Sequence, residues 1–391
     1  MSARTIHPFP ARMAPEIALD AIPERSQEPP LTVLDPMCGS GTVLSAAVSR
    51  GHYAIGVDID PLAVLMSRVA TSSLKGADLA GAADVVRETA DSEVGDAPWS
   101  DDETEKFSSF WFGAPQRRDL IALSSAISRV ADAATQDALR VALSRIIVTK
   151  SPQASLAADT SHSRPHRVMQ TSDYDVLTGF SRSVRSLGRL LDQRSIRGRA
   201  EVTAGDSREL ESVNDGTVDL VVTSPPYLNA LDYLRGHKLA LIWFGYSIPE
   251  LRRMRSASIG SERAPDGSLD EDQSALVELI RRDAADPEIL PVGTLRRFAV
   301  DMTTFASTTR RVVRDTGRIV VVVGNSTLRG NYIRNDLIAQ TALEQNGFNL
   351  VDRVEREIPD GRRYMAINTH APTSTLRKRM RSEVVLTMVT N

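Results

Sequence analysis

The chain has 391 residues, of which 41% are hydrophobic and 25% charged, an ordinary composition for a soluble globular protein of two or three domains. Its one cysteine, Cys38, excludes an intramolecular disulfide and a metal site built from cysteines, and it fits a reducing, cytoplasmic setting. The net charge of −3 is not typical of a nucleic-acid binder, and no apolar run reaches the roughly 20 residues that span a bilayer.

The N-terminal part of the chain carries an α/β pattern. Residues 31–34 predict a buried strand that runs into the glycine-rich segment 35–42 (Asp-Pro-Met-Cys-Gly-Ser-Gly-Thr). A helix over 43–50 and a second strand over 52–57, which ends at Asp58, complete a βαβ unit. Glycines let the backbone approach a ligand closely, and an acid in this position accepts hydrogen bonds from ribose hydroxyls. The unit therefore predicts a nucleoside-binding site.

The glycine segment bears on which nucleoside ligand binds. A dinucleotide fingerprint would carry a third glycine three residues after Gly41, where this chain has Leu44. Asp60, followed by Pro61, is typical of a helix N-cap with proline at the first helical position. This interpretation leaves Asp58 as the ribose acceptor and disfavours a nicotinamide dehydrogenase.

Residues 76–199 predict an α-helical insertion, because apolar residues recur there at helical spacing. Its last predicted helix carries Arg182, Arg185 and Arg189 at three- and four-residue spacing, which places them on one face. Such a stripe is either a solvated face or a surface for nucleic-acid phosphates.

The α/β pattern resumes at residues 200–203, and a buried strand over 218–222 then stops at Thr-Ser-Pro-Pro-Tyr, residues 223–227. Tandem prolines fix φ and carry no N–H, so they leave rigid carbonyls with no competing donors. A hydroxyl, aimed carbonyls and an aromatic face suit a planar ring that bears an amino group. Ser224 and the Pro225 carbonyl would accept the two amine hydrogens. The alternative is a proline-rich turn that only ends a strand.

Residues 246–295 predict a second, charged insertion. Its arginines, Arg252, Arg253 and Arg255 among them, adjoin a flexible serine-rich stretch, which is interpreted as a mobile loop over DNA or as a solvent-exposed loop. His237, on the helix predicted after residue 227, is a tempting general base. A histidine on a helix face is more often structural, however, so it is left out of the catalytic set.

Two motifs resemble those of S-adenosylmethionine-dependent amino-group DNA methyltransferases. Residues 35–42 resemble the Asp-Pro-x-x-Gly-x-Gly-Thr cofactor loop, and residues 223–227 match the Ser-Pro-Pro-Tyr motif without a gap. The resemblance covers roughly residues 1–75 and 200–390. It implies an α/β fold: a Rossmann-like seven-stranded methyltransferase sheet, mostly parallel with an antiparallel last strand and helices on both faces, here with helical insertions. It also implies S-adenosylmethionine as cofactor, no metal, and double-stranded DNA as partner, with a restriction or defence-system partner left open.

The resemblance implies a role for each motif residue. Asp206 corresponds to the acid that contacts the adenine amine, although an ordinary turn aspartate is the alternative, and Phe9, in the predicted arm over residues 5–17, would lie near the cofactor. The implied catalytic residues are Ser224, Pro225, Pro226 and Tyr227. The implied cofactor-binding residues are Phe9, Asp35, Pro36, Met37, Gly39, Gly41, Thr42, Asp58, Ile59, Asp206 and Ser207.

The resemblance leaves the methyl acceptor open. Serine at position 224 is usual among cytosine-N4 enzymes but also occurs in adenine-N6 enzymes, so we expect cytosine N4 with adenine N6 as the alternative. Related loops methylate protein glutamine amides or guanine amines in RNA, and asparagine or aspartate in place of serine is usual there. A nucleic-acid-binding module without catalysis would be expected to have lost a motif residue.

The expected organisation follows from these motifs. Too few residues separate Asp206 from the catalytic motif to hold a recognition domain, so we expect target recognition in the insertions or in a partner chain. The predicted parts are an arm with the cofactor-binding half over 1–75, an α-helical insertion over 76–199, the catalytic half over 200–245, a charged insertion over 246–295 and the remainder of the sheet over 296–391.

Overall fold

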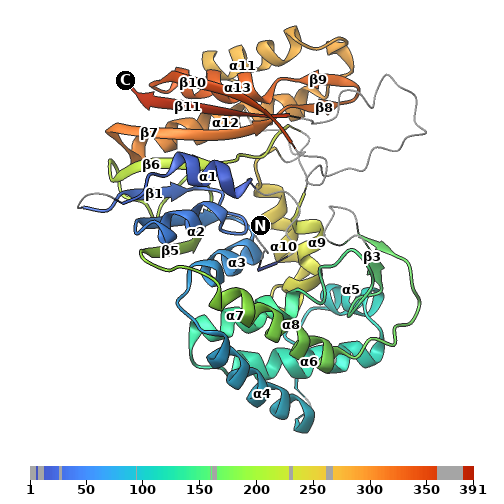
Figure 1. Ribbon diagram of the computed structural model, residues 1–391. Coiled ribbons are helices and arrows are strands. Elements are labelled where there is room, and N and C mark those ends of the chain that lie inside the picture. Colours follow the sequence, from blue (N-terminus) through green and yellow to red (C-terminus); the bar gives the residue numbers. More distant parts are fainter. Residues whose placement is uncertain are drawn as a thin grey trace.

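A seven-stranded sheet forms the centre of the structure (Figure 1), a computed structural model. The residues that it describes are 6–7, 13–25, 29–93, 95–158, 160, 165–228, 232–260, 267–358 and 382–391. The strands of the sheet are β1 (Thr32–Asp35), β2 (Tyr53–Asp58), β5 (Arg199–Ala204), β6 (Val218–Thr223), β7 (Val313–Gly324), β10 (Phe348–Glu357) and β11 (Ser382–Thr390).

The strands lie in the order β10-β11-β7-β6-β1-β2-β5. All neighbouring strands are parallel except for β11, which lies antiparallel between β7 and β10. This is the mostly parallel sheet with an antiparallel last strand that we expected. The predicted fold class, an α/β Rossmann-like methyltransferase fold, is confirmed.

Helices cover both faces of the sheet. Strand β7 shows why: Ile319, Val321 and Val323 belong to the core on one face, whereas Val320 and Val322 belong to the core on the other. A strand buried on both sides reads as a continuous apolar run, as predicted. The helices on one face are α1 (Pro15–Ala21), α2 (Thr42–Ser49) and α3 (Pro61–Thr71), and those on the other are α11 (Glu271–Arg282), α12 (Val292–Val312) and α13 (Asn335–Gln345).

The helices that follow α3 and precede β5 pack beside the sheet rather than on it, in the lower part of Figure 1. With α3 they share a core in which Phe112, Phe180 and Trp243 are fully buried. Pro115 lies in the first turn of one of these helices, and Asp132 caps the start of another by accepting from the Thr135 amide at 2.8 Å. The helices are α4 (Gly76–Ser92), α5 (Asp102–Trp111), α6 (Ala114–Ser128), α7 (Ala133–Ser144) and α8 (Val176–Asp192), joined in this region by α9 (Leu234–Leu241) and α10 (Ile248–Ala257) from later in the chain.

Short elements complete the described chain. They are the strand pairs β3 (Ala157–Ala158) with β4 (His166–Arg167) and β8 (Ser326–Leu328) with β9 (Asn331–Ile333), and the 3-10 helices η1 (Ile242–Phe244) and η2 (Pro287–Ile289). None of the helices in the part of the chain that the structure describes is long and apolar enough to cross a membrane.

Candidate active site

The glycine segment turns tightly between β1 and α2. Gly39 and Gly41 have positive φ angles of 51° and 78°, which side chains rarely adopt. A Cβ at Gly41 would also lie 3.0 Å from the Cα of Ser67 in α3. Position 41 therefore favours glycine both for its φ angle and for the short distance to α3. As a result, backbone without side chains lies at the carboxyl edge of the sheet.

Asp58, at the end of β2, lies beneath this segment with its carboxylate oriented by two backbone amides. Its Oδ2 accepts from the Gly39 amide at 2.8 Å, and its Oδ1 accepts from the Asp60 amide at 2.9 Å. Burial and the neighbouring Asp60 raise the pKa of Asp58 to about 6, against the two amide hydrogen bonds. Asp60 caps α3 by accepting from the Leu62 amide at 2.9 Å, which confirms the predicted N-cap.

The two motifs meet at the ends of β1 and β6. These strands are parallel neighbours, so their carboxyl ends lie side by side. The Thr223 hydroxyl donates to Oδ1 of Asp35 at 2.9 Å, and both residues are buried. Burial raises the pKa of Asp35 to about 7, opposed by the hydrogen bonds from Thr223 and from the Met37 amide. This bond directly joins residues 35–42 to residues 223–227.

Ser224 and Tyr227 lie together just beyond β6. Burial raises the pKa of the Tyr227 hydroxyl, and a hydrogen bond with Ser224 opposes that rise. The backbone after Tyr227 is anchored by Asn335, whose Oδ1 accepts from the Leu228 amide at 3.0 Å and whose Nδ2 donates to the Gly324 carbonyl at 3.1 Å. Sequence reasoning missed Asn335, because a single asparagine at a helix start carries no local signal of this contact.

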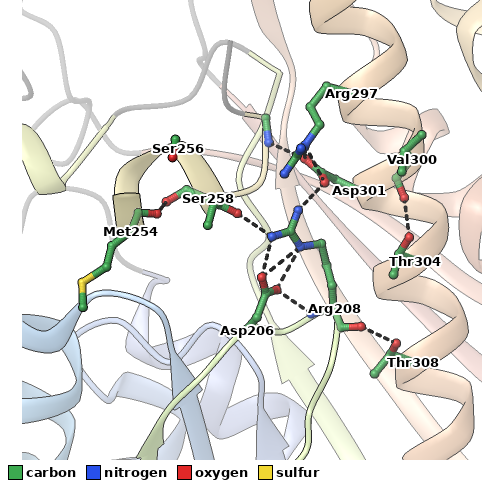
Figure 2. A network of polar contacts seen from close by, with 12 residues as sticks. Asp206, Arg208, Met254, Ser256, Ser258, Arg297, Val300, Asp301, Thr304 and Thr308 are labelled. Atoms are coloured by element: carbon green, nitrogen blue, oxygen red, sulfur yellow. Dashed lines mark hydrogen bonds and ion pairs between the residues drawn. The ribbon is translucent and has the colours of Figure 1, made fainter. Parts of the chain in front are cut away.

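Asp206, in the loop after β5, takes part in an ion-pair network (Figure 2). Arg208 lies between Asp206 and Asp301, with its Nε 2.9 and 3.1 Å from the two oxygens of Asp206 and its Nη1 2.5 Å from Asp301. Arg297, one turn before Asp301 in α12, donates to Asp301 at 3.0 Å. These carboxylates raise the pKa of Arg208 above its usual value, Asp206 most strongly. The backbone amide and Nη2 of Arg208 also donate to Asp206, so both of its oxygens are engaged by Arg208. The contact of Asp206 with an adenine amine stays a prediction.

The remaining predicted cofactor residues share this edge of the sheet. Pro36 and Met37 follow β1, Ile59 follows β2, and Ser207 follows Asp206 in the loop after β5. Phe9 lies outside the described residues. The structure thus brings the loops of both motifs to one edge, whereas their roles in binding and catalysis stay predictions.

The two arginine sets differ in their surroundings. Arg252 forms an ion pair with Glu103, and Arg255 pairs with Asp232. The exposed stripe on α8 has no ion pair or hydrogen bond to its guanidinium groups within the described part of the chain; it comprises Arg182, Arg185 and Arg189. The α8 stripe therefore presents three cationic side chains on one helix face without ion-pair partners among the described residues.

Comparisons with known proteins add a second line of findings. No protein-family model matches the chain. Type II methyltransferase M.BsoBI of Geobacillus stearothermophilus is 42% identical over 50 residues, which are 13% of this chain and 10% of that protein. Type II methyltransferase M.MvaI of Kocuria varians is 35% identical over 78 residues, 19% of this chain and 17% of that protein. The matched part thus spans less than a fifth of either relative.

Two solved methyltransferase structures align with most of the chain. The geranyl diphosphate C-methyltransferase of Streptomyces coelicolor A3(2) is 9% identical with a TM-score of 0.35, and the alignment covers 96% of this chain and 77% of that one. The rRNA methyltransferase aviRa of Streptomyces viridochromogenes is 12% identical with a TM-score of 0.31, over 96% and 86% of the two chains.

The strand order and the two joined motifs define the class: the chain has the Rossmann-like methyltransferase fold. Within this class, its sequence resembles amino-group DNA methyltransferases, and the matched segments of the two type II enzymes support that resemblance.

Proposed function

We propose that the chain is a DNA methyltransferase that moves a methyl group from S-adenosylmethionine to the exocyclic amine of a flipped base, cytosine N4 rather than adenine N6. The observation that carries this proposal is the buried hydrogen bond from Thr223 to Asp35, 2.9 Å long. It joins the strand end that precedes the glycine segment to the strand end that bears Ser224, so a methyl donor and an amine acceptor would be held against each other.

The donor side has a chemistry that fits the cofactor. A side chain at Gly41 would be crowded against Ser67, and Asp58 is oriented by the amides of Gly39 and Asp60. Asp58 would accept hydrogen bonds from the ribose hydroxyls, and Asp206 would accept from the adenine amine. When bound, S-adenosylmethionine supplies an electrophilic methyl group on its sulfonium.

The acceptor side is the tip at residues 223–227. An exocyclic amine is unreachable inside the base stack, so the base must first be extruded. The Ser224 hydroxyl and the Pro225 carbonyl would accept the two amine hydrogens, which draws the nitrogen lone pair out of conjugation with the ring. Tyr227 would stack on the base. The preference for cytosine rests on the resemblance, since serine can serve either base.

Double-stranded DNA is the proposed partner. The α8 stripe supports this, because guanidinium groups without ion-pair partners can neutralise phosphates. The two type II enzymes that share segments with this chain add support by association for a DNA substrate. A role in restriction or defence belongs to the same proposal.

The test is incubation with labelled S-adenosylmethionine and unmodified DNA, RNA and protein pools, followed by nucleoside analysis. Label in DNA as N4-methyldeoxycytidine is expected. N6-methyldeoxyadenosine alone would contradict the choice of cytosine, and label confined to RNA or protein would contradict the DNA substrate.

Variants of the tip test the mechanism. Removal of a hydrogen-bonding group poised for the transition state costs on the order of 100-fold or more in kcat. Ser224→Ala and Tyr227→Ala should therefore lose turnover while S-adenosylmethionine binding survives. Ser92→Ala, at an exposed serine of α4, is the matched control for Ser224→Ala. Near-normal methylation by both tip variants would rule the mechanism out.

A further inference from the structure

His237 is buried beside the cofactor side of the site. It lies in the first turns of α9, the helix that follows the catalytic tip. Its Nδ1 is 2.5 Å from Oδ2 of Asp60, and the two side chains are only 2% and 8% exposed. Breaking a buried polar contact of this kind is costly, because the remaining side chain is left without a hydrogen-bond partner in the protein interior.

Asp60 connects this histidine to the cofactor side of the site. Its other oxygen, Oδ1, accepts from the Leu62 amide, and its own amide donates to Asp58. Asp58 in turn accepts from the Gly39 amide at 2.8 Å. An unbroken series of hydrogen bonds therefore runs from α9 to the glycine segment.

Helix α9 is also held from its other sides. At Gly236 a Cβ would lie 2.0 Å from the carbonyl oxygen of Thr160, so the backbone of the helical insertion presses directly on α9. The ring of His7, from the N-terminal arm, meets that of His237 edge-on with centroids 6.5 Å apart. Burial, and then His237 and Arg145, lower the pKa of His7 well below its usual value, so His7 adds no charge to the pair.

We infer that His237 is a positioning residue for methyl transfer: through Asp60 it holds α9, and with it the tip at residues 223–227, in register with Asp58 and the glycine segment. This inference rests on the proposed function and names a further residue of the same site. The physical reason is the steep dependence of group transfer on geometry, in which about 1 Å of misplacement costs on the order of 100-fold in rate. In this role His237 would set the distance between the methyl donor and the amine without contacting either of them.

Two variants separate the effect of losing the hydrogen bond to Asp60 from the effect of changing the size of the side chain. His237→Ala removes the contact with Asp60, whereas His237→Asn keeps an N–H donor close to the place of Nδ1. His166→Ala, an exposed histidine of the helical insertion, is the matched control. Thermal unfolding checks that each variant is folded.

Hydrogen exchange of the cofactor-free protein tests the link itself. His237→Ala should speed exchange at the amides of Gly39, Asp60 and Leu62 at least tenfold, and His237→Asn should leave them close to wild type. Unchanged exchange in His237→Ala, or equal exchange in the two variants, would overturn the inference. This measurement decides the link even if the wild-type chain methylates no DNA, an outcome that would refute the proposed function instead.

Kinetics test the consequence. His237→Ala should lower kcat about 10- to 100-fold with KM for DNA changed less than threefold, and His237→Asn should recover most of the loss. If kcat of His237→Ala stays within threefold of wild type, His237 is a structural contact and the positioning role is wrong.

Discussion

Replacing Thr223 by valine tests the bond between the two motifs. Valine keeps the shape of threonine but removes the hydroxyl that donates to Asp35. Thr223 is 0% exposed and Asp35 is 4% exposed, so water cannot replace the missing donor. Among the residues that the structure describes, the Met37 amide, at 3.2 Å, is then the one donor left to the carboxylate. A hydrogen bond to a charged group contributes about 1.5–3 kcal/mol, against about 0.5–1.5 kcal/mol for a neutral pair.

The pKa of Asp35 gives this prediction a pH signature. Burial raises it to about 7, so Asp35 is protonated at pH 5.5 and ionised at pH 8.5. A raised carboxyl pKa means that the folded state binds the proton more tightly than the unfolded chain, so stability from this group falls as pH rises through 7. Because the Thr223 bond lowers that pKa, its loss should raise the pKa further, at about 1.4 kcal/mol per unit. The cost of Thr223→Val should therefore be larger at pH 8.5 than at pH 5.5.

The assay is urea unfolding at the two pH values, with Thr223→Ser as the control that keeps the hydroxyl. We expect a loss of about 1.5–3 kcal/mol at pH 8.5 and about 0.5–1.5 kcal/mol at pH 5.5, with equal denaturant slopes. Equal losses at both pH values, or a serine variant as unstable as the valine variant, would refute the reasoning.

Three further predictions concern the cofactor, the DNA and the thiol. Because burial raises the pKa of Asp58 to about 6, the affinity for S-adenosylmethionine should weaken as pH falls through 6. Asp58→Ala should abolish this pH dependence and should also remove two hydrogen bonds of about 1.5–3 kcal/mol each, which calorimetry measures. Unchanged affinity in Asp58→Ala would contradict the assignment of Asp58 to the ribose hydroxyls. Replacing Arg182, Arg185 and Arg189 by glutamine should lower the salt slope of DNA binding by about 0.9 for each phosphate that is no longer neutralised. The same change at Arg252 and Arg255, which already form ion pairs, should leave the slope unchanged. An unaltered slope in the triple variant would contradict a DNA contact by the α8 stripe. Burial raises the pKa of Cys38 well above its usual value, so a maleimide should label it slowly in native protein and quickly in urea, and rapid native labelling would contradict its burial.

Local patterns in the sequence predicted the elements that depend on local physics. The apolar runs predicted the strands, and Asp60 followed by Pro61 predicted the start of α3. The partners that organise the site are distant in the chain: Arg208 meets Asp301 at a separation of 93 residues, Leu228 meets Asn335 at 107, and Asp60 meets His237 at 177. The sheet order decides such pairings, and no spacing rule reveals them.

The same limit applies to charge. The sequence shows Arg252 and Arg255 as a basic cluster, yet acids from α5 and from the segment before α9 neutralise them. Helical spacing correctly placed Arg182, Arg185 and Arg189 on one face of α8, because that depends on the helix alone. Whether a cation is available to a ligand depends on which other segments the fold brings to it.

The place of β11 in the sheet has a consequence for how the protein is made. It is the last of the seven strands to leave the ribosome, yet it lies between β7 and β10. Until residues 382–391 emerge, β7 and β10 each present an unpaired edge, and unpaired edges are templates for aggregation. Val384, Leu386 and Met388, all buried in the finished core, are also missing from the nascent sheet. The order of synthesis therefore leaves both edges exposed until this one strand inserts between them.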